Sequence, residues 1–126
     1  MKKIILDTNF LLIPYQFHVD IFSEIDRICG FSYRIYVLDK TLDELKKVSS
    51  EQGSKHRLAA RLGLSFIRAK AVKKIRTWSS KDVDTLLAEM SRKDDVIIAT
   101  QDKELKKRLQ CPVIIMRQKT HLVLEK

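Results

Sequence analysis

Four acidic residues stand where the sequence indicates the end of a strand or the early part of a helix: Asp7, Glu44, Asp84 and Asp102. Carboxylates that crowd together repel one another, so such a cluster requires a cation. Hard oxygen ligands without a cysteine or histidine cluster favour Mg²⁺ or Mn²⁺. An ion of this kind activates a water, orients it toward phosphorus and stabilises the leaving oxygen. These residue types therefore favour metal-assisted hydrolysis of a phosphate ester.

Two of the acids follow short apolar segments. Asp7 comes directly after KIIL, and Asp102 comes two residues after VIIAT. If these segments are neighbouring parallel strands, their carboxyl ends meet at one edge of the sheet and the two carboxylates share a crevice. Each acid also has a purely structural interpretation, since the triplet DTN is a turn signal and Asp102 is a candidate cap for the helix after it.

The other two acids fall within expected helices. Glu44 lies three residues after Thr41, and the pair also matches a capping box, which would leave Asp43 as the alternative acid. Asp84 lies on the border of an apolar helical stripe, from where it reaches either a crevice or solvent. Asp82 occupies the other border and matches a capping box with the serine three residues before it.

The sequence argues against several other kinds of chemistry. The histidines His18, His56 and His121 form no motif, and we expect structural or surface roles for them. Neither GxxxxGK[ST] nor GxGxxG occurs, which argues against nucleotide-dependent classes. Cys29 and Cys111 are isolated, so we expect small buried hydrophobic residues rather than a disulfide or a zinc site.

The positive charge is concentrated in one stretch, residues 46–76, which we call the basic segment. The chain has a net charge of +9, and the segment holds ten of the 25 basic residues but only one of the 16 acids, so the remainder is neutral. Such a surface attracts a polyanion. A solvated helix face is the alternative, but the carboxylates favour RNA phosphates as the partner. The basic residues are Lys46, Lys47, Lys55, Arg57, Arg61, Arg68, Lys70, Lys73, Lys74 and Arg76.

Aromatic side chains offer a second means of holding a nucleic acid. Tyr15, Phe17, Tyr33, Tyr36 and Trp78 are candidates for stacking on bases. Core packing is nevertheless the expected role for most of them.

The size and composition fit one soluble domain that spans residues 1–126. Apolar residues make up 44% of the chain and charged residues 33%, which argues against disorder. No apolar run approaches the roughly 20 residues of a membrane span. Residues 1–6 are too short for the core of a signal peptide. We expect a cytoplasmic protein without a membrane partner.

The elements that must position the acids alternate between strand and helix. The apolar and β-branched runs predict strands at 2–6, 34–38, 75–78, 96–100, 113–116 and 121–124. The helical stripes predict helices at 19–29, 41–48, 54–72, 81–90 and 103–109. This alternation favours an α/β fold with a parallel sheet and helices on both faces.

Four segments, taken together, resemble the motifs of PIN-domain nucleases. They are IILDTNFLL, TLDEL, VDTLLAEM and VIIATQDKELKKRL, in the order and spacing of the family and over nearly the whole chain. The stretch DTNFLLIPYQFHVDIF is similar to stand-alone archaeal PIN proteins akin to the endonuclease that processes small-subunit ribosomal RNA. VapC-type toxins are also similar, but their sequence motifs are more distant.

The resemblance implies a three-layer α/β/α fold with a parallel sheet ordered 3-2-1-4-5. It also implies Mg²⁺- or Mn²⁺-dependent cleavage of single-stranded RNA, with a role in rRNA processing. The four acids match the four family acids, of which Asp7, Asp84 and Asp102 would ligate metal. Asn9 and Thr100 match small polar residues that would orient these ligands.

Two positions depart from the family pattern. Gln101 stands where an Asn is frequent, and Thr85 stands where a second Asp is frequent. If these departures weaken the catalytic site, the alternative to a nuclease is a module that binds RNA or a ribosome-assembly partner without cutting RNA. Another alternative is a toxin RNase with an antitoxin partner. The family also implies that a homodimer forms.

Overall fold

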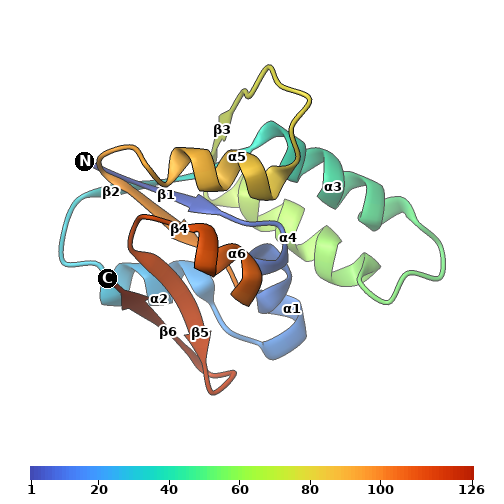
Figure 1. The fold of residues 1–126 in the computed structure, drawn as a ribbon. Helices are drawn as coiled ribbons and strands as arrows, with labels where there is room; N and C mark the ends of the chain where they lie inside the picture. The colour runs from blue at the N-terminus through green and yellow to red at the C-terminus, as the bar shows by residue number, and fades with distance from the viewer.

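The computed structural model describes residues 1–126 as one six-stranded sheet with helices on both faces (Figure 1). The strands are β1 (Lys2–Leu6), β2 (Tyr33–Leu38), β3 (Lys73–Ile75), β4 (Val96–Ala99), β5 (Val113–Arg117) and β6 (His121–Glu125). The helices are the 3₁₀ turn η1 (Asn9–Leu12), α1 (Ile13–Phe17), α2 (Ile21–Ile28), α3 (Asp39–Ser50), α4 (Arg57–Ala69), α5 (Val83–Met90) and α6 (Lys103–Arg108).

The order of strands across the sheet is β3-β2-β1-β4-β5-β6. The first five strands pair in parallel, and β6 pairs antiparallel with β5. Strand β1 lies between β2 and β4, so the chain reverses its direction of travel across the sheet at β1. The structure therefore confirms the expected order 3-2-1-4-5, with β6 added at the edge.

Alternating side chains of the central strands divide the core into two layers. Ile4 and Leu6 of β1 belong to the larger cluster, which is covered by η1 and helices α1 to α4. Ile5 points the other way and packs in a smaller cluster with Leu87 of α5 and Leu105 of α6. Because β1 is buried on both faces, its sequence is a continuous apolar run. The expected three-layer α/β/α arrangement is confirmed.

The outer edge of β6 is covered by α2. The main-chain N–H of Leu122 donates to Glu24 Oε1 at 3.0 Å, and its carbonyl accepts from Arg27 at 3.2 Å. Hydrogen bonds from Arg27 and from Leu122 lower the pKa of Glu24 to about 2. These contacts satisfy the main-chain groups of Leu122 on the open side of β6, which limits pairing of this strand with another chain.

The helix expected at 54–72 is shorter than its periodicity suggests. It begins at Arg57, because Ser54 Oγ accepts from the main-chain N–H of His56 and holds the preceding residues in a turn. Gly53 adopts a φ of 81° in the same turn, which favours glycine. The strand expected at 75–78 was placed too late, since β3 ends at Ile75.

Neither capping box forms. Thr41 is fully buried within α3, whose N-cap is Leu38, so it cannot cap the helix. Asp82 is itself the N-cap of α5 and accepts from the main-chain N–H of Thr85 at 2.9 Å. Two further helical segments, η1 and α1, fall at residues 9–17, where the sequence carried no clear expectation.

Other expectations concern single residues and the membrane. Cys29 is buried as expected, whereas Cys111 is half-buried, and both thiols are free. The longest helix, α4, has 13 residues, and none of the helices is long and apolar enough to traverse a bilayer.

Helix α4 crosses η1 so closely that only glycine fits at position 63. A Cβ atom added there would lie 2.7 Å from the carbonyl oxygen of Leu11. We expect Gly63→Ala to lower the free energy of unfolding by about 1 kcal/mol or more, because the clash outweighs the better helix propensity. Urea unfolding measures this change. Gly30→Ala, with nothing within 4 Å, is the control and should stay within about 0.5 kcal/mol; equal stabilities for the two variants would contradict the close crossing.

Candidate active site

Strands β1 and β4 place two of the predicted acids at the same edge of the sheet. Leu6 pairs with Ala99, and the main-chain N–H of Asp7 donates to the Ala99 carbonyl at 2.9 Å. Asp102 follows three residues later as the N-cap of α6. Both carboxylates therefore lie at the carboxyl ends of adjacent parallel strands, at the point where the strand order reverses.

The other two acids reach the same place from helices. Glu44 lies on α3, which begins directly after β2, and Asp84 is the second residue of α5. The four acids line one cleft of about 280 Å³, which we call the acid cleft. Its remaining lining residues are Thr8, Asn9, Leu12 and Val83. Asp43 is exposed and does not line this cleft, and neither do the three histidines.

Asp7 is the most buried of the four acids, with 4% of its surface exposed. One carboxylate oxygen accepts from the main-chain N–H of Thr8 at 2.8 Å, and the other accepts from Thr100 Oγ1 at 2.7 Å. Thr100 Oγ1 in turn accepts from the main-chain N–H of Asp102 at 3.0 Å. The buried hydroxyl of Thr100 thus connects the ends of β1 and β4 and fixes the orientation of Asp7.

Thr8 and Asn9 connect the end of β1 to two neighbouring segments, α3 and the loop after β4. Thr8 Oγ1 donates to Glu44 Oε1 at 3.0 Å, which ties α3 to the end of β1. Asn9 Oδ1 accepts from the main-chain N–H of Gln101 at 3.3 Å. The role of Thr8 had no signal in the sequence, because it depends on how α3 packs beside β1.

Asp102 both caps α6 and lines the acid cleft, the two alternatives that the sequence left open. Its Oδ1 accepts from the main-chain N–H groups of Glu104 and Leu105, at 2.9 and 3.1 Å, and so caps α6. Its Oδ2 accepts no hydrogen bond from the protein and is free to face the cleft. Capping and a position beside the other acids are therefore compatible.

The acids interact unfavourably as anions. Burial raises the pKa of Asp7, and the charges of Asp84 and Asp102 raise it further, against the hydrogen bonds from Thr100 and Thr8. Burial, together with the charge of Asp102, likewise raises the pKa of Asp84. The folded protein therefore resists full ionisation of this cluster, as expected for a site that requires a counter-charge.

Two basic side chains that lie outside the basic segment stand close to the acids. Arg108 donates to Thr85 Oγ1 at 3.3 Å, and its charge works to lower the pKa of both Asp82 and Asp84. Lys40, in the first turn of α3, lines the groove beside the cleft. Sequence reasoning missed both residues, since both lie outside the segment that carries the net charge of the chain.

The donor set of the cleft fits a hard divalent cation. It offers only oxygen ligands, and the carboxylate of Asp84, Oε2 of Glu44 and Oδ2 of Asp102 accept no hydrogen bond from the protein. No three of these side chains converge closely enough to hold one ion in the arrangement that the structure shows. The fit therefore rests on the ligand chemistry and on the mutual repulsion of the acids.

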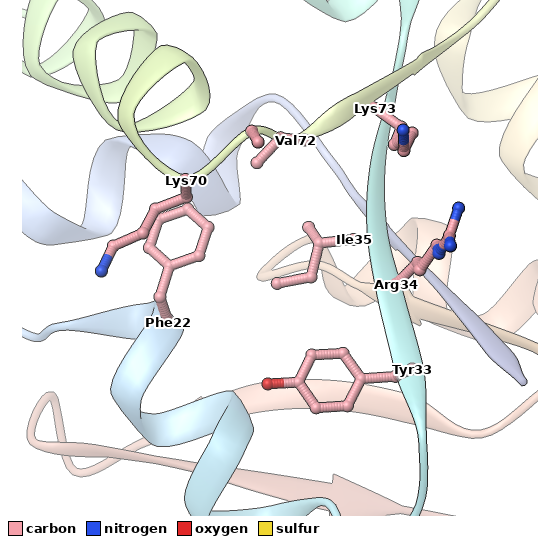
Figure 2. Close-up of a pocket in the computed structure, with 8 residues that line it drawn as sticks. Phe22, Tyr33, Arg34, Ile35, Lys70, Val72 and Lys73 are labelled. Carbon is pink, nitrogen blue, oxygen red and sulfur yellow. The ribbon is translucent and has the colours of Figure 1, made fainter.

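The basic segment does not form one continuous face along the acid cleft. All of its basic residues except Arg57 are exposed, but they spread over α3, α4, β3 and the loops that follow these elements. Lys70 and Lys73 help to line a pocket of about 380 Å³ at the amino end of β2, away from the acids. Figure 2 shows Lys73 and Arg34 on one side of β2, with Tyr33 and Ile35 on the other.

The aromatic residues mostly pack against the core, as expected. Phe17 and Tyr33 contact the larger cluster, and Tyr36 contacts the smaller one. Tyr15 and Trp78 are the exceptions, with 43% and 85% of their surface exposed.

Comparison with known proteins identifies the family. Residues 4–119 match the family described as PIN like domain, and the chain therefore belongs to it. It is similar to Ribonuclease VapC4 of Methanocaldococcus jannaschii, with 28% identity over 124 residues that cover 96% of this chain and 95% of the relative. It also resembles the structure of the PIN domain endonuclease Utp24, with a TM-score of 0.76. That match has 21% identity, covers 98% of this chain and 90% of the other, and shows the shared fold.

The raised pKa of Asp7 makes stability depend on pH in a defined direction. The folded state holds the proton of Asp7 more tightly than the unfolded state, so without divalent ions the contribution of Asp7 to stability should fall as pH rises above about 4. We expect Asp7→Asn to flatten this dependence and to be more stable than the wild type near neutral pH. Urea unfolding in EDTA across this range measures the effect, with Asp43→Asn as the control. An Asp7→Asn protein less stable than the wild type at every pH would contradict the electrostatic account.

Proposed function

We propose that this protein is a metal-dependent endoribonuclease that hydrolyses phosphodiester bonds in single-stranded RNA, and that residues 1–126 act as one PIN domain. The observation that carries the proposal is that four acids from distant parts of the chain line one cleft at the carboxyl ends of β1 and β4. Membership of the PIN-like family and the similarity to a ribonuclease, VapC4, support it.

In this proposal Asp7, Asp84 and Asp102 hold Mg²⁺ or Mn²⁺, directly or through water. Glu44 completes a second metal position or orients the attacking water through the oxygen that Thr8 leaves free. A bound divalent ion would neutralise charge on the phosphate and lower the pKa of a bound water. The protein itself supplies a rigid frame of main-chain and hydroxyl hydrogen bonds around the acids.

Two polar residues act by positioning these ligands. Thr100 donates to Asp7 while it accepts from the Asp102 main chain, so one hydroxyl sets the relative placement of both carboxylates. Asn9 performs a similar task between the loops that follow β1 and β4. Partners of this kind fix the orientation of metal ligands in many sites.

The ten residues of the basic segment are proposed to bind RNA phosphates outside the cleft. Nine of them are exposed, and the segment carries the entire net charge of the chain. They spread over α3, α4, β3 and the loops that follow these elements, so they present positive charge over a broad surface. Their contribution to RNA binding should weaken with added salt.

The similarity to VapC4 favours a second candidate, a toxin RNase with the same chemistry that is held inactive by an antitoxin. A role in rRNA processing in the cytoplasm is the alternative setting. A neighbouring gene for a small DNA-binding protein that forms a complex with this chain would favour the toxin.

Cleavage of RNA tests the proposal. We expect the wild type to cut unstructured RNA in Mg²⁺ or Mn²⁺, to cut structured RNA less, and to lose activity in excess EDTA. Asp7→Asn should abolish cleavage, because it removes a buried ligand charge while keeping the shape of the side chain. Gel analysis of end-labelled RNA measures the products.

The matched control lies on α3. Glu44→Gln should strongly reduce cleavage, whereas Asp43→Asn, at an exposed neighbouring acid outside the cleft, should retain it. All variants are purified in parallel, so that a contaminating nuclease would appear in every sample. Undiminished activity in EDTA would rule out the metal mechanism, and equal activity of Asp7→Asn would rule out the site.

A further inference from the structure

The connection between β3 and α5 exposes the one tryptophan of the chain. Residues 76–82 project beyond α5 and the start of α3 (yellow in Figure 1). Trp78 lies in this loop with 85% of its surface in solvent and a φ of 48°, in the left-handed region that bulky residues rarely adopt. Local strain of this kind is often maintained at binding sites.

Neighbouring contacts hold the loop in place. Thr77 donates to Asp39 from its hydroxyl at 2.8 Å and from its main-chain N–H at 3.2 Å. Lys40 donates to the main-chain carbonyl of Lys81, and the main-chain N–H of Lys81 donates to Ser79 Oγ at 3.0 Å. Thr77 and Lys81 thus fix both ends of the loop to the first turn of α3, and Ser79 adds a hydrogen bond within the loop. Trp78 therefore lies on a loop that is held in place at both ends.

The loop borders a groove that continues from the acid cleft. This groove has a volume of about 430 Å³ and shares Glu44, Val83 and Asp84 with the cleft. Its other lining residues are Lys40 and residues 80–82. A polymer with its reacting bond at the acids therefore has a path past Lys40 toward the loop that carries Trp78. Lys81 also lines this path, with its ammonium group paired to Glu89.

The chemistry around the indole suits a nucleobase. The guanidinium of Arg76 lies over the ring, 5.8 Å from its centroid, and forms no ion pair with an acid. The high exposure of Trp78 leaves the opposite ring face open. An aromatic ring that stacks on a base, beside a cation that attracts the adjoining phosphate, is a common arrangement in proteins that bind single strands.

We propose that Trp78, with Arg76, forms a base-stacking subsite for single-stranded RNA on the loop that borders the groove. The identity of the ligand rests on the proposed function, but the contact itself is independent of cleavage. The subsite holds a nucleotide away from the scissile bond and reads no particular base, since every base offers a ring face.

The single tryptophan permits a direct test in solution. In EDTA, we expect a single-stranded oligoribonucleotide to quench the fluorescence of Trp78, because a stacked base contacts the indole. An abasic phosphodiester oligomer with the same number of phosphates should bind more weakly and should not quench. The same measurement over a range of protein concentrations without RNA detects a second copy of the chain as the occupant.

Variants test the contribution to affinity. By anisotropy of labelled RNA in EDTA, Trp78→Ala should weaken binding about tenfold, and Trp78→Phe should restore much of it. Tyr15→Ala, at the other exposed aromatic, should have no effect. In cleavage assays Trp78→Ala should raise KM with little change in kcat, since the ring does not touch the reacting atoms.

Three results would overturn the subsite: no quenching at saturating RNA, equal quenching by the abasic oligomer, or emission that depends on protein concentration alone. Cleavage that persists with any of these results would leave the proposed function intact. Quenching by RNA in a protein that never cuts would support the subsite while refuting the nuclease.

Discussion

The parallel pairing of β1 with β4 is the constraint on which the remaining structure depends. It places the chain reversal at β1, so the loops after β1 and β4 meet above one edge of the sheet. Helix α3 starts where β2 ends, and α5 begins above the same edge. Four acids separated by up to 95 positions thereby line one cleft. A shift of one residue in this pairing would invert the side chains of β1 and disrupt both core layers.

Repulsion among these carboxylates opposes the packing that assembles them. Apolar layers on both faces of β1 and β4 hold the strand ends rigid, and Asp7 is buried against them. Thr8 and Thr100 stabilise its charge in part, yet burial and the nearby acids still raise its pKa. The protein therefore orders the acids but leaves their negative charge uncompensated. A bound divalent cation would compensate it. The groove toward Trp78 and the lysines beside it then extend the cleft in the direction of a polymeric substrate.

The sequence predicted most of the fold because continuous apolar runs and helical stripes identify buried strands and amphipathic helices locally. It also predicted the positions of Asp7 and Asp102, since acids that closely follow neighbouring parallel strands lie at the carboxyl ends of those strands. It could not predict contacts between distant elements, such as Thr8 with Glu44 or Arg108 with Thr85. The capping boxes failed because α3 begins directly after β2, which places Thr41 inside the helix, and because Asp82 itself caps α5.

The central claim is that these acids form a cation site, and the direct measurement is crystallographic. Crystals soaked in Mn²⁺ should give an anomalous density peak in the cleft, in contact with Asp7, Asp84 and Asp102 after small side-chain movements. The same soak of Asp7→Asn crystals should weaken or remove the peak. A cleft without anomalous density at saturating Mn²⁺, in crystals that leave it open to solvent, would contradict the account.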